Sequence, residues 1–385
     1  MSEMNTSRVS EFILTGFPGL HPEYYGLASA VLFLVYFVTV LANITVFYLF
    51  ATNRCLHKPM YYIILNLSAC DLLFSTATLP KIISRYWFQA GTISFTGCFV
   101  QMFFVHYLGS VNSFILFLMA FDRYLAICHP LRYATYLKQT TLFFLSLSAW
   151  IIAIIVPVIL VIRAYPLPFC GPNKISHCFC DHVGITGLAC TDRTPYSFAA
   201  FVGAMITLLV PLSFIVFSYS AILIDVSKIA GFKNRIKSLS TCSTHLIIIS
   251  LYYLPRCFVY LTSYVGIVFS TDVRIVIIML YSLGPPMVNP LIYCLRAKDI
   301  RQCLWKHFYR MVSSQLDMPE ISHQGGIPNL MPKPPQLASS DAEVQWIYSE
   351  PLLDEQASHS FSKGQPRNPA AKTNFSRLYP HSHFP

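Results

Sequence analysis

The sequence predicts an all-α membrane protein, a seven-transmembrane helix bundle with a short amphipathic eighth helix. Composition is the first observation, because 55% of the 385 residues are hydrophobic and only 11% are charged, whereas a soluble domain has about 25% charged residues. The second observation is that apolar stretches of about 20 residues, long enough to cross a bilayer, recur along the chain. Length alone would suggest two or three soluble domains, but this spacing indicates one membrane bundle.

The apolar stretches alternate with short polar segments. In chain order they cover residues 27–50, 60–83, 98–126, 141–164, 197–226, 237–264 and 272–295. A proline inside a helix removes one backbone hydrogen bond, so we expect Pro80 to kink the outer end of the second stretch. These boundaries define an N-terminal leader (residues 1–26), the bundle (27–296) and two C-terminal segments.

The two C-terminal segments differ in composition from the bundle. Residues 297–310 predict an amphipathic helix on the membrane face, with apolar side chains on one side and basic side chains on the other. Within it, Cys303 is either a site of acylation or a small apolar residue. Residues 311–385 are rich in Pro, Ser, Gln and His and have no apolar periodicity, so we expect a disordered cytoplasmic tail.

Lys and Arg residues predict the orientation of the bundle. They collect in the loops after the first, third and fifth stretches and in the segment after the seventh. The positive-inside rule therefore places the leader outside the cell and the tail in the cytoplasm. The same distribution explains the net charge of +10, which would otherwise suggest a nucleic-acid partner. We therefore expect a lipid bilayer as a partner and no nucleic acid. The leader lacks a basic start followed by an apolar core, so we expect no cleavable signal peptide.

The leader carries a sequon for N-glycosylation, Asn-Thr-Ser, at Asn5. An extracellular leader makes this asparagine the expected acceptor. The other sequons lie in apolar stretches, at Asn43 and Asn66, or in the tail, at Asn374. We expect none of these three to be modified.

A charged triplet, Asp122-Arg123-Tyr124, stands at the end of the third stretch. The preceding residues 98–120 contain no Asp, Glu, Lys or Arg. The side chain of Arg123 can extend from this depth to the membrane–water interface, and Asp122 can hold it in an ion pair. For the pair alone, a flanking-charge anchor is the simplest interpretation.

The sequence around the triplet supports a more specific interpretation. The fifteen residues MAFDRYLAICHPLRY (119–133) closely resemble the signature of odorant receptors, a branch of the rhodopsin-like G protein-coupled receptors. Four further blocks match this family in order: LHKPMYYIILNLSACD (56–71), SYSAIL (218–223), KSLSTCSTH (237–245) and PMVNPLIYCLR (286–296). The resemblance covers about residues 12–309. The loop CDHVGITGLACTD and the position of Pro255 after two tyrosines are most similar to the fish-like class, whose members often detect water-soluble odorants.

The resemblance implies a receptor in the plasma membrane that binds a small-molecule odorant. A heterotrimeric stimulatory G protein would be its partner, and cyclic AMP would rise on activation. Neither an enzymatic activity nor a cofactor is expected, and the chain contains no zinc-protease H-E-x-x-H or G-x-S-x-G motif. A receptor of the same fold that detects an internal or pheromonal acid is the alternative. A transporter or channel would need a chain of polar groups or an inverted repeat, and the stretches contain only isolated charges.

Five of the twelve cysteines face the oxidising outside in this orientation. The resemblance implies two disulfides among them, Cys98–Cys180 and Cys170–Cys190, and leaves Cys178 over. His177, Cys178, Cys180 and His182 are also residue types that bind metals. A metal site there would compete with the disulfide for Cys180, so we expect no metal.

The resemblance also assigns a switch at the cytoplasmic end. Its residues are Asp122, Arg123, Tyr124, Tyr219, Asn289, Pro290 and Tyr293. Pro290 softens the seventh helix beside Tyr293. In the family, activation moves the inner end of the sixth helix outward, which uncovers Arg123 for the G protein. Agonist must then bind the open state better than the closed one.

Ligand candidates lie in the outer half of the bundle. Helical spacing places His106, Gly109 and Ser110 on the inward face of the third helix. No acid lies on that face, which excludes a receptor that pairs an acid with an ammonium ligand. Arg256 stands inside the sixth stretch, where an unpaired cation is costly, and it suits a carboxylate. Either a ligand anion or Asp181 from the outer loop would neutralise it. The further candidates are Tyr253, Tyr260, Thr207 and Tyr281.

Asp71 is a lone acid in the middle of the second stretch. An acid at bilayer depth should face the bundle interior, and we expect Asn43 and Asn289 nearby, with Asn112 as the neighbour on the third helix. Two states are open for Asp71. It is either ionised with a sodium ion or protonated without one.

Overall fold

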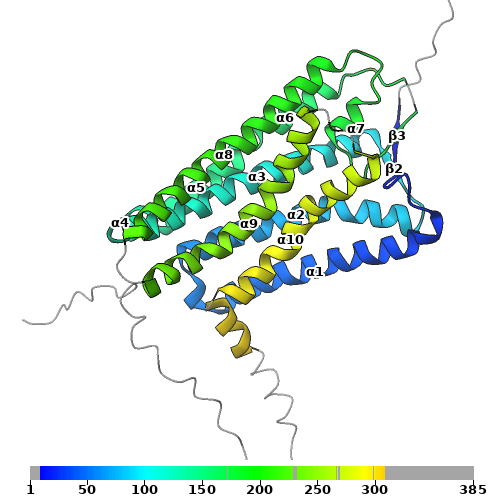
Figure 1. Cartoon of the computed structure of the whole chain (residues 1–385). Helices are drawn as coiled ribbons and strands as arrows, with labels where there is room; N and C mark the ends of the chain where they lie inside the picture. Colours follow the sequence, from blue (N-terminus) through cyan, green and yellow to red (C-terminus); the bar gives the residue numbers. More distant parts are fainter. Residues whose placement is uncertain are drawn as a thin grey trace, which may run out of the picture. The chain divides into compact units, whose positions relative to one another are not determined.

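The computed structural model describes residues 9–170, 172–228, 232–265, 267, 269–297 and 299–307. Within this part of the chain, seven helical segments are long and apolar enough to cross a membrane. They are formed by α1 (Tyr25–Thr52, preceded by the 3-10 turn η1, Pro22–Tyr24), α2 (Pro59–Trp87), α3 (Phe95–Cys128), α5 (Gln139–Ile152) with α6 (Ile155–Ala164), α8 (Thr194–Lys228), α9 (Phe232–Val265) and α10 (Thr271–Arg296). They lie side by side as a bundle (Figure 1). The predicted fold class is therefore confirmed.

The shorter elements cap the two ends of the bundle. One end carries the strands β1 (Glu11–Leu14), β2 (Thr92–Ser94) and β3 (Lys174–Ile175) and the helix α7 (His182–Thr186). The other end carries the 3-10 turn η2 (Arg54–Leu56), α4 (Pro130–Tyr136) and a terminal helix over residues 299–307. Figure 1 shows the strands and α4 at opposite ends. We call these ends the disulfide end and the Arg123 end, after the groups that they contain.

The fourth predicted span is broken into two helices. Residues 153 and 154 separate α5 from α6, and Pro157 follows within the first turn of α6. A proline ring clashes with the carbonyl group four residues earlier, which here belongs to Ala153. The break between α5 and α6 is therefore determined by the local sequence.

The outer surface of the bundle is apolar. Large hydrophobic side chains are exposed on the outward faces of the helices, for example Leu34 (60%) and Phe37 (54%) on α1. The buried side chains instead include polar groups such as Asn43, Asp71 and Asn289. Polar groups inside and apolar groups outside are the pattern expected for helices in lipid.

The leader forms a small sheet that the sequence analysis did not predict. β1 is the central strand, antiparallel to β2 and parallel to β3. Phe12 and Leu14 on β1 are completely buried and belong to the same core cluster as Cys98 and Cys180. The leader continues over the bundle, where the Phe17 N–H donates to the Tyr86 hydroxyl (2.8 Å).

Candidate functional site

Arg256 on α9 lies between two tyrosine rings. Its guanidinium carbon is 4.3 Å from the ring centre of Tyr252 and 4.7 Å from that of Tyr281. Tyr252 stands one helical turn before Arg256, whereas Tyr281 comes from α10. Cation–π contacts of this kind contribute about 0.5–2 kcal/mol each. The aromatic pair therefore stabilises the cation within the bundle and joins α9 to α10.

Gly109 is the point at which α3 faces this arginine. A Cβ built on Gly109 would lie 4.0 Å from Nη1 of Arg256. The Tyr252 hydroxyl donates to the Gly109 carbonyl oxygen at 2.5 Å. Gly109, Tyr252, Arg256 and Tyr281 thus form one cluster between α3, α9 and α10, which we call the Arg256 cluster.

His106 lies one turn above Gly109 on α3 and faces the outer loop. Its Nε2 atom is 3.4 Å from Oδ1 of Asp181, the residue that also caps α7 by accepting from the Val183 N–H (3.2 Å). Burial would raise the pKa of Asp181, but the hydrogen bond and charge of His106, with the charges of His177 and His182, hold it well below its ordinary value. Asp181 is therefore partnered by His106.

Two further loop histidines are held neutral by burial. The pKa of His182 is lowered to about 4, by burial first and then by the charge of His106. Burial also lowers the pKa of His177. Next to His177, the buried Cys178 thiol has its pKa raised to about 12 by desolvation. Cys178 is thus a neutral packing group beneath the loop.

The disulfide end contains the two disulfides that the family resemblance implies. Cys98 at the start of α3 is joined to Cys180, and Cys170 to Cys190. The first bond fixes the loop that carries Asp181 and His182 onto α3. It also occupies Cys180, the residue that a metal site would have needed.

Several predicted ligand residues make hydrogen bonds inside the bundle. The Ser110 hydroxyl donates to the His106 carbonyl (2.9 Å) and the Thr207 hydroxyl to the Gly203 carbonyl (3.0 Å). The Tyr253 hydroxyl lies 2.7 Å from Oγ of Ser113. Tyr260 lies outside the residues whose side chains the structure describes.

Tyr252 and Ser113 are site residues that sequence reasoning missed. Ser113 donates to the Thr207 carbonyl of α8 (2.9 Å) in addition to its contact with Tyr253 of α9. The spacing of four residues between Tyr252 and Arg256 was the available signal, because it places both on one helix face. Nothing in the sequence pattern marks Ser113.

At the other end of the bundle, Arg123 is paired with Asp122. Nη2 and Nε of Arg123 lie 2.6 and 3.0 Å from Oδ2 of Asp122. Oδ1 of Asp122 accepts from the Tyr133 hydroxyl on α4 (2.8 Å). Both members of the ion pair are buried. Tyr124, the third residue of the triplet, faces away, and its hydroxyl lies 3.1 Å from Nε2 of His129.

Tyr219 and His245 lie buried near Arg123. Among the described residues, the Tyr219 hydroxyl and both ring nitrogens of His245 have no hydrogen-bond partner. Tyr293 on α10 is buried as well, with its hydroxyl 3.8 Å from the Met119 sulfur. The role of His245 was not predicted from the sequence, although a histidine within an apolar span is a visible signal. The Tyr219 hydroxyl and the His245 ring can accept or donate hydrogen bonds in a different arrangement of the helices.

The Asp71 carboxylate lies at the centre of a polar cluster between α1, α2, α3 and α10. Nδ2 of Asn289 donates to Oδ2 of Asp71 (2.9 Å), Asn112 lies beside the same carboxylate, and Asn43 donates to the Pro286 carbonyl (3.0 Å). Five buried oxygens have no hydrogen-bond partner among the described residues: Asp71 Oδ1, Asn43 Oδ1, Asn112 Oδ1, Asn289 Oδ1 and Ser75 Oγ. Carboxylate, amide and hydroxyl oxygens are the donors that a small hard cation prefers. The donor set fits a sodium ion.

Comparison with known proteins covers most of the bundle. A family model described as olfactory receptor matches residues 32–311. Human olfactory receptor 52B2 is 38% identical over 300 residues, which cover 77% of this chain and 92% of that receptor. Human olfactory receptor 10A3 is 35% identical over 312 residues, covering 81% of this chain and 98% of that receptor. Squid rhodopsin, at 17% identity, has a similar fold, with a TM-score of 0.63 over 77% of this chain and 89% of that chain.

Proposed function

Because the chain belongs to the olfactory receptor family of G protein-coupled receptors, we propose that it detects a small, water-soluble anion and activates a stimulatory G protein that raises cyclic AMP. Members of this family are signalling receptors rather than enzymes, and their partners are a small-molecule ligand, a G protein and the membrane. The Arg256 cluster carries the proposal for the ligand.

An arginine between two aromatic rings is suited to bind a carboxylate. The rings of Tyr252 and Tyr281 cover the guanidinium, while its N–H groups lie in the guanidinium plane, the direction from which a carboxylate is held bidentately. Gly109 presents no side chain toward Nη1 of Arg256, which favours a ligand group at that position. The polar pair His106 and Asp181 lies next to the Arg256 cluster, on the side of the outer loop.

The Arg123 end is the proposed site of G protein coupling. Arg123 is held by Asp122, and agonist would favour a state in which α9 moves and Arg123 becomes accessible. The Tyr219 hydroxyl and the His245 ring would then find new partners, because buried polar groups without partners are costly where they stand. Asn289, Pro290 and Tyr293 on α10 would transmit the change from the Asp71 cluster.

The proposed orientation follows from the basic loops at the Arg123 end. It places the leader outside the plasma membrane, the loops after α1, α3 and α8 in the cytoplasm, and the tail (residues 311–385) on the same side. Asn5, the proposed glycosylation site, and the whole tail (residues 311–385) lie outside the described residues. An N-terminal epitope detected on unpermeabilised cells, and a loss of carbohydrate in Asn5→Gln, would test both assignments.

The ligand proposal is tested by Arg256→Ala in cells that express the receptor with a stimulatory G protein. Carboxylic acids and neutral odorants are screened in parallel for cyclic AMP. We expect the variant to lose at least tenfold in potency for an acid agonist, since a charge-assisted hydrogen bond contributes about 1.5–3 kcal/mol. Arg163→Ala is the matched control, because Arg163 also stacks on a tyrosine, Tyr196 at 5.5 Å, but is exposed. An unchanged acid response in Arg256→Ala would exclude the anchor.

A receptor for an internal acid shares all of these features. The same Arg256 cluster would bind a metabolite or pheromone that carries a carboxylate. The tissue in which the receptor is expressed, measured by transcript abundance, separates this alternative from odour detection.

A further inference from the structure

Two thiols from distant parts of the chain face each other at the Arg123 end. Sγ of Cys55 in η2 lies 3.3 Å from Sγ of Cys303 in the terminal helix, although 248 residues separate them in sequence. Cys55 is exposed, whereas only 6% of Cys303 is accessible. The pair thus has one thiol that solvent can reach and one that is covered.

Polar contacts on both sides hold these thiols together. On one side, Asp299 accepts from Nζ of Lys58 (2.7 Å) and from the Tyr61 hydroxyl (3.1 Å). On the other side, Nε2 of His307 lies 3.1 Å from Nδ2 of Asn53. Asp299 and His307 stand one turn before and one turn after Cys303, so the terminal helix is fixed in register on the loop between α1 and α2.

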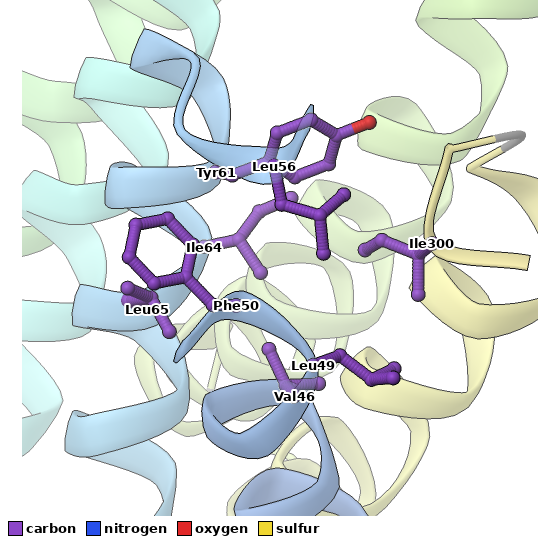
Figure 2. Close-up of a pocket in the computed structure, with 8 residues that line it drawn as sticks. All are labelled: Val46, Leu49, Phe50, Leu56, Tyr61, Ile64, Leu65 and Ile300. Carbon is purple, nitrogen blue, oxygen red and sulfur yellow. The ribbon is translucent and has the colours of Figure 1, made fainter. Parts of the chain in front are cut away.

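An apolar contact reinforces this register. Ile300, three residues before Cys303, is one of the residues around a small recess between α1, α2 and the terminal helix. Figure 2 shows the Ile300 side chain pointing from its helix toward Leu56 and Ile64. Ile300 is 2% exposed. Because residues three apart share a helix face, the contact that seats Ile300 also directs Cys303 toward Cys55.

We propose that Cys55 and Cys303 form a reversible disulfide that locks the terminal helix onto the loop between α1 and α2 when the cytoplasm becomes oxidising. The inference rests on the proposed orientation, which places both thiols in a reducing compartment where disulfides are absent at rest. A shift of about 1.2 Å brings the two sulfurs from their present contact to the bond length of a disulfide, about 2.05 Å.

Hydrogen peroxide is a sufficient oxidant for this step. The exposed Cys55 thiolate attacks one peroxide oxygen, the O–O bond breaks, and Cys55 becomes a sulfenic acid while hydroxide leaves. The Cys303 thiolate then attacks the Cys55 sulfur, the S–O bond breaks, and a second hydroxide leaves. The two thiol protons convert the two hydroxides to water, so two thiols and one peroxide give one disulfide and two waters.

The environments of the two thiols make Cys55 the first to react. Burial, the adjacent Cys55 thiol and Asp299 raise the pKa of Cys303 to about 11, so Cys303 is protonated while the exposed Cys55 meets the oxidant. Acylation of Cys303, the modification that the sequence suggested, would require the terminal helix to leave the loop. The structure therefore favours a bond within the chain at this position.

The test maps disulfides in the full-length receptor. Intact cells are treated with hydrogen peroxide or left untreated, free thiols are then blocked, and the receptor is digested with trypsin without reduction. Cleavage after Arg301 and Lys306 releases a peptide of residues 302–306, and cleavage after Arg54 releases one that begins at Cys55. We expect these two peptides as a linked species in treated cells only, two hydrogens lighter than the sum of the two peptides with Cys70 carrying the blocking group, and its loss after dithiothreitol.

Three variants control the assignment. Cys55→Ser and Cys303→Ser should each abolish the linked species, whereas Cys294→Ser, at the end of α10, should not. Treated cells in which Cys55 carries only a small-molecule adduct, with no linked species, would overturn the proposal. Complete linkage in untreated cells would overturn the oxidant control and also the proposed orientation, since it would indicate an oxidising compartment. A failed Arg256→Ala test would leave this result unaffected.

Discussion

Three charged side chains of the described bundle, one buried and two partly buried, each have a distinct neighbour. Arg123 is paired with Asp122, Arg256 is stacked on tyrosines, and Asp181 is partnered by His106. Removing one member of a buried ion pair costs about 3–5 kcal/mol, because the other charge is left uncompensated. The proposed roles of two of these residues differ accordingly: Arg123 would exchange its partner Asp122 for a G protein contact, whereas Arg256 would keep its tyrosine neighbours and bind the ligand.

The first prediction concerns Arg123. Arg123→Ala should suppress the cyclic AMP response per receptor at the cell surface. The loss of the cation beside Asp122 lowers stability, but Tyr133 still donates a hydrogen bond to Asp122 in the variant, so part of the surface expression remains. Arg132→Ala is the matched control, because Arg132 is an exposed arginine on the neighbouring α4. Flow cytometry of an N-terminal epitope measures expression. Full coupling in Arg123→Ala would contradict the assigned role.

The second prediction concerns acid sensitivity of the loop over the disulfide end. His182 has a folded-state pKa of about 4, below the value of about 6.5 in an unfolded chain. The unfolded loop therefore binds a proton that the folded loop excludes. The stabilisation is complete above about pH 6.5 and is lost as the pH falls toward 4. The charges of His106 and Asp181 act on His182 and are already included in its lowered pKa.

Thermal unfolding of the purified receptor between about pH 7.5 and 4.5 measures this effect. The melting temperature should fall over this interval in the wild type and fall less in His182→Gln, which cannot gain the proton. Equal losses in both proteins would assign the acid sensitivity to other groups.

Among the elements, β1 is a short strand that connects two loops at the disulfide end. Its four residues join the loop before α3 to the loop that carries Cys180 and Asp181. Phe12 packs against Phe95 and Phe169, with ring centroids 5.6 Å apart in both cases. The strand therefore holds the outer loop in place independently of the disulfides.

Phe12→Ala tests this role of β1. Loss of a fully buried phenylalanine costs about 3–5 kcal/mol, so we expect the melting temperature to fall and agonist potency to decrease with it. Val9→Ala is the control, because Val9 is only partly buried beside the same cluster. If Phe12→Ala keeps full stability, β1 does not stabilise this end of the bundle.

On the scale of the whole described bundle, polar contacts join helices that are distant in sequence. Ser113 connects α3 to α8 and α9, Asn43 connects α1 to α10, and Asp71 with Asn289 connects α2 to α10. In lipid there is little hydrophobic drive between helices, so such contacts and close packing determine the arrangement. A cation in the Asp71 cluster would couple both ends of the bundle, because it would bind the helices that carry Asn112 and Tyr293.

The prediction at this scale is an effect of sodium on agonist potency. Sodium should favour the present arrangement, in which the oxygens around Asp71 converge and Arg123 is paired, and so should lower potency. Replacing sodium by N-methylglucamine should raise potency in the wild type and leave Asp71→Asn unchanged. Cyclic AMP dose–response curves in both media provide the measurement. A sodium effect that persists in Asp71→Asn would place the ion elsewhere.

Much of the fold could be predicted because its signals are local. Apolar stretches marked the seven spans, and Pro157 marks the fourth span, which is broken into α5 and α6. The β1 strand was missed, since four residues with alternating burial are a weak signal in a polar leader. Asn289 was expected near Asp71, and Tyr281 was among the ligand candidates. Tyr252 and Ser113 were missed, because their roles depend on the rotation of each helix about its axis.

The sequence by itself determined the family, the seven spans and the segments that carry charge, because membrane insertion and short motifs are encoded by residue type and spacing. Only the tertiary structure decided which groups meet: Asp181 with His106, Arg256 with Tyr252 and Tyr281, and Cys55 with Cys303 across 248 residues. The physical reason is that hydrogen bonds, cation–π contacts and thiol contacts act over a few ångströms. They therefore depend on the packing of helices, which no single segment specifies.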